Sequence, residues 1–70
     1  MTLKKRSFTL SRHRTSVALE EEFWAVLEQE ARQAEKSLAA VVAEIDSTRG
    51  MRPLASALRL YALAAAKSAP

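Results

Sequence analysis

The chain has 70 residues, no cysteine, a single histidine (His13) and a net charge of +3. These counts exclude a disulfide framework and a metal site built from thiolates or from a cluster of histidines. A chain this short has room for one domain with a thin core. Without disulfides or a metal site, self-association is the remaining way to stabilise such a domain, and we expect it here.

The charges are unevenly distributed along the chain. Residues 1–19 carry five basic side chains and no acid, whereas residues 20–36 carry six glutamates and two basic side chains. This uneven distribution indicates that the basic segment faces a polyanion and that the acidic helix beside it faces solvent. The basic run at residues 4–6, taken alone, is equally well explained as a solvated tail. We expect residues 1–11 to be a mobile basic arm and residues 12–67 to be a single domain.

Residues 13–19 are the only part of the chain whose pattern predicts a β-strand. Apolar or β-branched residues alternate there with small or polar ones, as in a strand with one face on a core. A lone strand leaves its backbone N–H and C=O groups unpaired and therefore needs a second strand. The predicted core face holds Thr15, Val17 and Leu19, and the predicted free face holds Arg14, Ser16 and Ala18.

A first helix is predicted from about residue 20 to residue 36. Three glutamates begin it, which suits the positive end of the helix dipole, but Glu20 is a weak N-cap. Trp24 is expected to be mostly buried against the second helix or a partner chain. The predicted apolar stripe is Phe23, Leu27, Ala31 and Ala34, with Trp24 and Val26 on its flanks.

A second helix is predicted in "KSLAAVVAEIDSTRG", where Ser37 is a good N-cap and Gly50 a plausible residue after the C-cap. Its apolar positions, which follow the helical template, are Leu38, Val41, Val42 and Ile45.

A third helix is predicted in "MRPLASALRLYALAAAKSAP", with Pro53 near its first position. Leu60 and Leu63 lie outside its main stripe, so the apolar arc is wide and favours a subunit contact. Ordinary exposed leucines are the alternative. The predicted main stripe is Leu54, Leu58, Tyr61 and Ala65.

Few residues in the chain favour catalysis, and we expect no enzyme activity and no cofactor. His13 is the only imidazole, and no glycine-rich phosphate loop is present. DNA binding is better supported, because Arg14 can bridge a guanine edge, Ser16 can contact any base, and a two-stranded ribbon fits the major groove. An edge strand whose charge discourages aggregation is the alternative interpretation of the same residues.

The order of elements, with "HRTSVALEEEFWAVL", "LAAVVAEID" and "ASALRLYAL", resembles the ribbon-helix-helix family of DNA-binding repressors. It is most similar to a bacterial subgroup with an added third helix. The resemblance, which covers residues 12 to about 49, implies a mainly α homodimer. The strand would pair antiparallel with the same strand of its dimer mate and enter the major groove. The family usually has glycine in the turn between its two helices, where this chain has "QAEKS".

The resemblance also implies the residues that would contact DNA. Base-facing positions would be held by Arg14, Ser16 and Ala18, with Arg12 in line with them. Phosphates would be held by Ser37 at the start of the second helix and by the neighbouring Lys36. The basic residues Lys4, Lys5 and Arg6 would add attraction that does not depend on sequence.

We therefore expect a cytoplasmic, homodimeric transcription regulator that binds double-stranded DNA and has no contact with a membrane. The uncharged stretches are too short to span a bilayer, and the basic start lacks the apolar region of a signal peptide. The alternative is a protein-interaction or antitoxin-like module that keeps the dimer fold, binds a partner protein and has little or no DNA readout.

Overall fold

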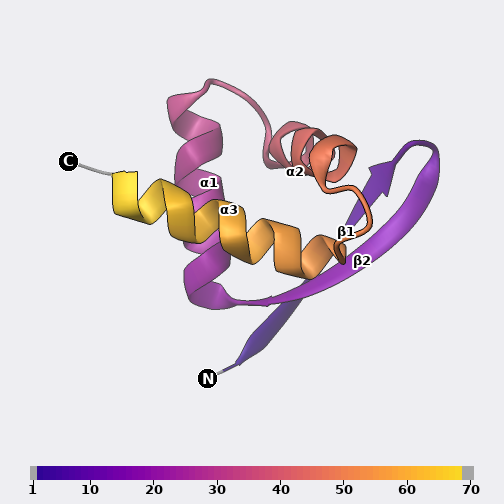
Figure 1. The fold of residues 1–70 in the computed structure, drawn as a ribbon, viewed down its shortest axis with the longest axis horizontal. Helices are drawn as coiled ribbons and strands as arrows, with labels where there is room; N and C mark the ends of the chain where they lie inside the picture. Colours follow the sequence, from indigo (N-terminus) through magenta and orange to yellow (C-terminus); the bar gives the residue numbers. More distant parts are fainter. Residues whose placement is uncertain (1, 69–70) are drawn as a thin grey trace.

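The computed structural model describes residues 2–68 as a β-hairpin followed by three helices (Figure 1). The helices lie against one face of the hairpin, and α3 packs on α1, on α2 and on β2. The elements are β1 (Leu3–Leu10), β2 (His13–Glu20), α1 (Glu21–Gln33), α2 (Leu38–Thr48) and α3 (Leu54–Ser68).

The first strand corrects the sequence analysis, which expected a mobile arm over residues 1–11 and only one strand. Residues Leu3–Leu10 form β1, which pairs antiparallel with β2 from Leu3 opposite Glu20 to Leu10 opposite His13. The alternation in β1 is hard to recognise because Lys4 and Arg6 share a face with the apolar residues that follow them. The pairing of β2 with the β2 of a dimer mate stays a prediction.

A two-residue turn at Ser11 and Arg12 joins the strands. Both residues have positive φ values, 50° and 69°, as the central residues of a type I′ hairpin turn require. That turn matches the right-handed twist of the strands, but Asn-Gly is its usual sequence. Each non-glycine residue in this left-handed region costs about 1–2 kcal/mol, so the hairpin contains local strain.

The hairpin and α1 are joined through Trp24, whose predicted burial is confirmed by an exposed fraction of 1%. Its indole Nε1–H donates to the carbonyl oxygen of Lys4 at 2.8 Å, and its ring centroid lies 5.9 Å from that of Phe8. The residue therefore anchors β1, an element that the sequence analysis did not predict. The buried stripe of α1 is Trp24, Leu27 and Ala31, while the predicted members Phe23 and Ala34 are half-buried and exposed.

The turn after α1 forms without the glycine that is usual in the family. Glu35 takes the left-handed conformation with a φ of 56°. The amide of Lys36 donates to the carbonyl of Ala31 at 2.9 Å, and that of Glu35 donates to Arg32 at 3.1 Å. These two bonds make a Schellman motif, which satisfies the last carbonyls of α1.

The ends of α2 agree with the sequence analysis. The Ser37 hydroxyl accepts from the amide of Ala40 at 3.0 Å, so the predicted N-cap is confirmed. Arg49 is the C-cap and Gly50 follows it with a φ of 64°, as predicted. The predicted apolar residues of α2 are buried or half-buried.

The buried face of α3 differs from the predicted stripe. Ala57, Leu58 and Ala62 are buried, whereas Tyr61 is 41% exposed. Two small alanines thus face the core, while the larger Tyr61 lies at its margin. No helix within residues 2–68 is both long enough and apolar enough to cross a bilayer.

Candidate nucleic-acid interface

The outer face of the hairpin is small, polar and basic. Residues opposite each other in an antiparallel pair share a face, so the register assigns each side chain to one side of the sheet. The inner face supplies Phe8, Leu10, Val17 and Leu19 to the core. The outer face carries Lys5, Ser7 and Thr9 from β1 beside Ala18, Ser16 and Arg14 from β2, and no acid lies among these six.

Two side-chain contacts cross this face from strand to strand. The hydroxyls of Ser7 and Ser16 lie 2.9 Å apart and share a hydrogen bond. The Arg14 guanidinium donates to the Thr9 hydroxyl over a long contact of 3.4 Å. All four residues are exposed, so the remaining donors and acceptors of the face are open to solvent. This is the kind of chemistry that recognises base edges in the major groove.

Other basic residues lie around this face. Arg12 is exposed in the hairpin turn, and Lys4 is exposed on β1 although the register gives it to the inner face. Arg6 is placed differently. Its guanidinium carbon lies 5.1 Å from the centre of the Trp24 ring, and its Nη1 donates to Glu28 at 3.0 Å. Arg6 therefore covers the core and pairs with an acid of α1, and is not displayed with Lys5.

The two residues predicted to hold a phosphate at the start of α2 already make contacts within the protein. The Ser37 hydroxyl caps its own helix, and Lys36 Nζ lies 2.6 Å from Glu44 Oε2. Both members of this ion pair are exposed, so the pair is weak and salt-sensitive. The helix start still has free amides to offer an anion, while the nearby lysine shares its charge with Glu44.

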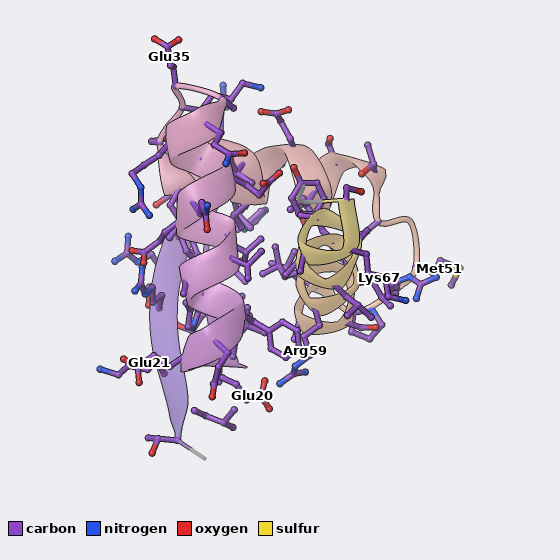
Figure 2. The ribbon with its side chains drawn as sticks, turned by 90° about the vertical axis from the view of Figure 1, so that its left-hand side faces the viewer. Glu20, Glu21, Glu35, Met51, Arg59 and Lys67 are labelled. Carbon is purple, nitrogen blue, oxygen red and sulfur yellow. The ribbon has the colours of Figure 1, made fainter. Side chains whose placement is uncertain are left out.

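Two of the acids near the hairpin are held in ion pairs. Glu28 pairs with Arg6, and Glu20, at the end of β2, accepts from Arg59 Nε on α3 at 2.9 Å. Figure 2 shows Glu20 and Arg59 directed at one another near the start of α1, with Glu35 at the opposite end of that helix. The hydrogen bond from the Arg59 guanidinium lowers the pKa of Glu20 below its ordinary value.

The helical side of the molecule carries two shallow grooves, of about 570 and 480 Å³, which adjoin at shared residues. One lies between α1 and the second half of α3, and the other lies between α1 and α2. Residues 2–68 hold no group of three acidic or histidine side chains arranged for a metal ion. The residues shared by the grooves are Glu30, Gln33 and Tyr61.

Comparison with known protein families agrees with this architecture. The model of the ribbon-helix-helix domain matches residues 3–66 and so includes both strands and nearly all of α3. The chain therefore belongs to the ribbon-helix-helix family, whose fold is that of DNA-binding regulators. No curated protein and no solved structure matches the chain significantly.

Proposed function

We propose that this protein is a sequence-specific DNA-binding transcription regulator that acts as a homodimer. The observation that carries the proposal is the outer face of the hairpin, which is basic and free of acids among its six central residues, all exposed except the half-buried Ala18. Arg14 provides a bidentate donor for guanine, Ser16 a donor or acceptor, and Ala18 an apolar contact for a thymine methyl. Membership of the ribbon-helix-helix family supports the same function.

The phosphate contacts in this proposal come from residues around that face. Lys4, Lys5 and Arg12 supply positive charge next to the hairpin, and the free amides at the start of α2, beside Ser37, supply a neutral anion site. We leave Arg6 out of the DNA contact, because its guanidinium already pairs with Glu28 and lies over the ring of Trp24. Affinity should fall steeply with salt, since each neutralised phosphate releases counterions.

The test is to incubate the purified protein with sheared genomic DNA and sequence the fragments that it retains. We expect a shared motif, and we expect Arg14→Ala to cost about 1–3 kcal/mol at each base that this residue contacts. Arg32→Ala is the matched control, because Arg32 is an exposed arginine of the acidic helix α1. Retention of DNA without any shared motif, or equal loss in both variants, would exclude sequence-specific recognition by the hairpin.

The homodimer is supported by two features of the single chain. A strand has two edges, and within residues 2–68 β2 is hydrogen-bonded only to β1. On α3, Leu60 and Leu63 are 46% and 47% exposed and three residues apart, so they lie on one face of the helix. We expect a dimer in sedimentation experiments at micromolar concentration, and Leu63→Glu should weaken it if α3 forms the contact. A folded monomer of about 7.7 kDa under these conditions would contradict the homodimer.

The alternative function, a protein-interaction or antitoxin-like module, is favoured by the adjoining grooves on the helical side. They have apolar lining from Val26, Val41 and Ile45, acidic residues at Glu30 and Glu44, and one basic residue, Lys36, paired with Glu44. Such a surface fits a helical segment of a partner protein with basic flanks. The retained-DNA experiment separates the two functions, because an interaction module would retain no preferred sequence.

A further inference from the structure

Lys36 comes directly before the N-cap of α2, but its charge is held by an acid of that helix. We propose that Glu44 limits the affinity for DNA, because it competes with a DNA phosphate for the Lys36 ammonium. While this ion pair is closed, the start of α2 offers a phosphate its amides but no lysine. This inference rests on the proposed function and adds to it a residue that sets the strength of the phosphate contact.

The ion pair lies along the side of α2 and not at its end. Lys36 Nζ is 2.6 Å from Glu44 Oε2, and both side chains line the groove between α1 and α2. The Cα of Glu44 is about 9 Å along the helix axis from that of Leu38, the first residue of α2. Helical side chains lean toward the N-terminus, so the Glu44 carboxylate reaches back to Lys36. The ammonium is therefore drawn into the groove.

A released Lys36 would add to groups that already attract an anion. The Ser37 hydroxyl accepts from the amide of Ala40, whereas the amides of Leu38 and Ala39 have no acceptor within the helix. These two amides and the helix dipole attract a phosphate with partial charges only. An ammonium directed at the same phosphate would contribute a full charge and a charge-assisted hydrogen bond. Release of Lys36 should therefore strengthen the phosphate contact measurably.

Lys36 is easier to release than Arg6, the other predicted phosphate-binding residue that pairs with an acid. Arg6 has two contacts, since it donates to Glu28 at 3.0 Å and lies 5.1 Å from the centre of the Trp24 ring. Among the side chains that the structure describes, Lys36 pairs with Glu44 alone, and the two are 45% and 59% exposed. Such an exposed pair is weak, and a phosphate competes well for the lysine because DNA binding releases counterions.

Exchange between the two partners needs only a rotation of side chains. The amide of Lys36 donates to the carbonyl of Ala31 at 2.9 Å, which fixes the backbone at this point. At Glu44 the backbone carbonyl accepts from the Ser47 hydroxyl at 2.7 Å, a contact that does not involve the carboxylate. Glutamine keeps the length of the glutamate side chain and a similar helix propensity. Substitutions of Lys36 and Glu44 by glutamine should therefore leave the fold intact, which thermal melting checks.

The test is a double-mutant cycle of Glu44→Gln and Lys36→Gln, measured on DNA that the parent protein selects from a random pool. We expect Glu44→Gln to raise the affinity of the dimer roughly 4- to 25-fold, since release of one exposed ion pair in each chain is worth a factor of about 2 to 5. In the Lys36→Gln background this gain should be lost, because the lysine through which Glu44 acts is absent.

Glu35→Gln is the matched control. Glu35 is an exposed glutamate beside Lys36, in the turn between α1 and α2 (Figure 2). Its substitution removes the same charge near the start of α2, so it measures the general effect of an acid on approaching DNA. We expect a clearly smaller gain from Glu35→Gln than from Glu44→Gln. In the Lys36→Gln background, the two glutamate substitutions should have equal effects.

The salt dependence of binding gives a second measurement on the same variants. One added phosphate contact in each chain should steepen the slope of log affinity against log salt by about 1.8 in the Glu44→Gln dimer. The Glu35→Gln dimer should keep the slope of the parent.

The outcomes separate this inference from the proposed function. Equal gains from Glu44→Gln and Glu35→Gln in the parent background would overturn the inference and leave the proposed function standing. The same holds if the gain from Glu44→Gln persists without Lys36. A parent protein that binds no DNA would overturn both.

Discussion

The hairpin and the helical layer carry opposite charge. The hairpin and its turn, residues 3–20, hold five basic side chains and one acid, whereas α1 holds four glutamates and one arginine. The single acid of the hairpin, Glu20, is held by Arg59 of α3. A polyanion that approaches the hairpin therefore meets positive charge first, with most of the acids in the layer behind it.

The two regions also contribute differently to the core. In the hairpin, adjacent residues serve different purposes, because Val17 is buried while Ser16 next to it is exposed. In α1 the buried residues recur every three or four positions and leave the rest of the helix to solvent. Substitutions in the hairpin can thus separate stability from recognition at neighbouring positions. Four predictions test the comparison between the hairpin and the helical layer.

The largest expected effect is at the joint between the two regions. Trp24→Ala should lower the free energy of unfolding by about 3–5 kcal/mol, because it empties a fully buried aromatic site. Chemical denaturation gives this quantity directly. Trp24→Phe is the control, since it keeps a ring but loses the bond to the Lys4 carbonyl, and it should cost clearly less. An unchanged denaturation midpoint for Trp24→Ala would mean that the hairpin does not depend on this residue.

The two faces of β2 should differ sharply in their effect on stability. Leu19→Ala removes a fully buried side chain and should cost about 2–5 kcal/mol. Ser16→Ala, on the other face, should change stability by less than about 1 kcal/mol, because its hydrogen bond to Ser7 is exposed. Thermal melting of the two variants makes the comparison. Similar losses in both would show that the outer face also supports the fold.

A matched pair of glycine substitutions compares the turns of the two regions. Arg12 in the hairpin and Glu35 in the helical layer both have positive φ, so glycine at either position should raise stability by roughly 0.5–1 kcal/mol. Gln29→Gly, at an exposed position in the interior of α1, is the control and should lower it by about 1 kcal/mol. Only Arg12→Gly should also weaken DNA binding. Weaker binding by Glu35→Gly would indicate that the helical layer contacts DNA.

The smallest expected effect concerns the contact between Glu20 and Arg59. Because the folded state lowers the pKa of Glu20, the charged form stabilises the fold above the ordinary pKa of this carboxyl. That contribution is lost as the pH falls through the lowered value. Glu20→Gln should therefore be less stable than the parent near neutral pH and approach it in acid. Melting curves over this pH range that stay a constant distance apart would rule out the linkage.

Local sequence signals predicted the three helices and the ends of α2, but not the whole buried faces of α1 and α3. Ser37 and Gly50 are residue types with strong end preferences, so the limits of α2 were predictable from them alone. The free face of β2 was predictable because Arg14 and Ser16 alternate with Val17 and its neighbours. The left-handed Glu35 was not predictable, since glutamate has no preference for that conformation and α2 packs back on α1 through contacts between distant residues.

The sequence alone determined the three helices and the outward residues of β2, because periodicity and capping act over a few neighbouring residues. The family was indicated by the resemblance of the whole order of elements, and the family match over residues 3–66 confirmed it. Tertiary structure decided that Leu3–Leu10 is a strand, since its basic residues hide the alternation and only pairing with β2 reveals it. It also decided that Arg6 lies on Trp24 and that Tyr61 lies at the margin of the core. These outcomes depend on side chains from distant elements meeting in space, which no local pattern encodes.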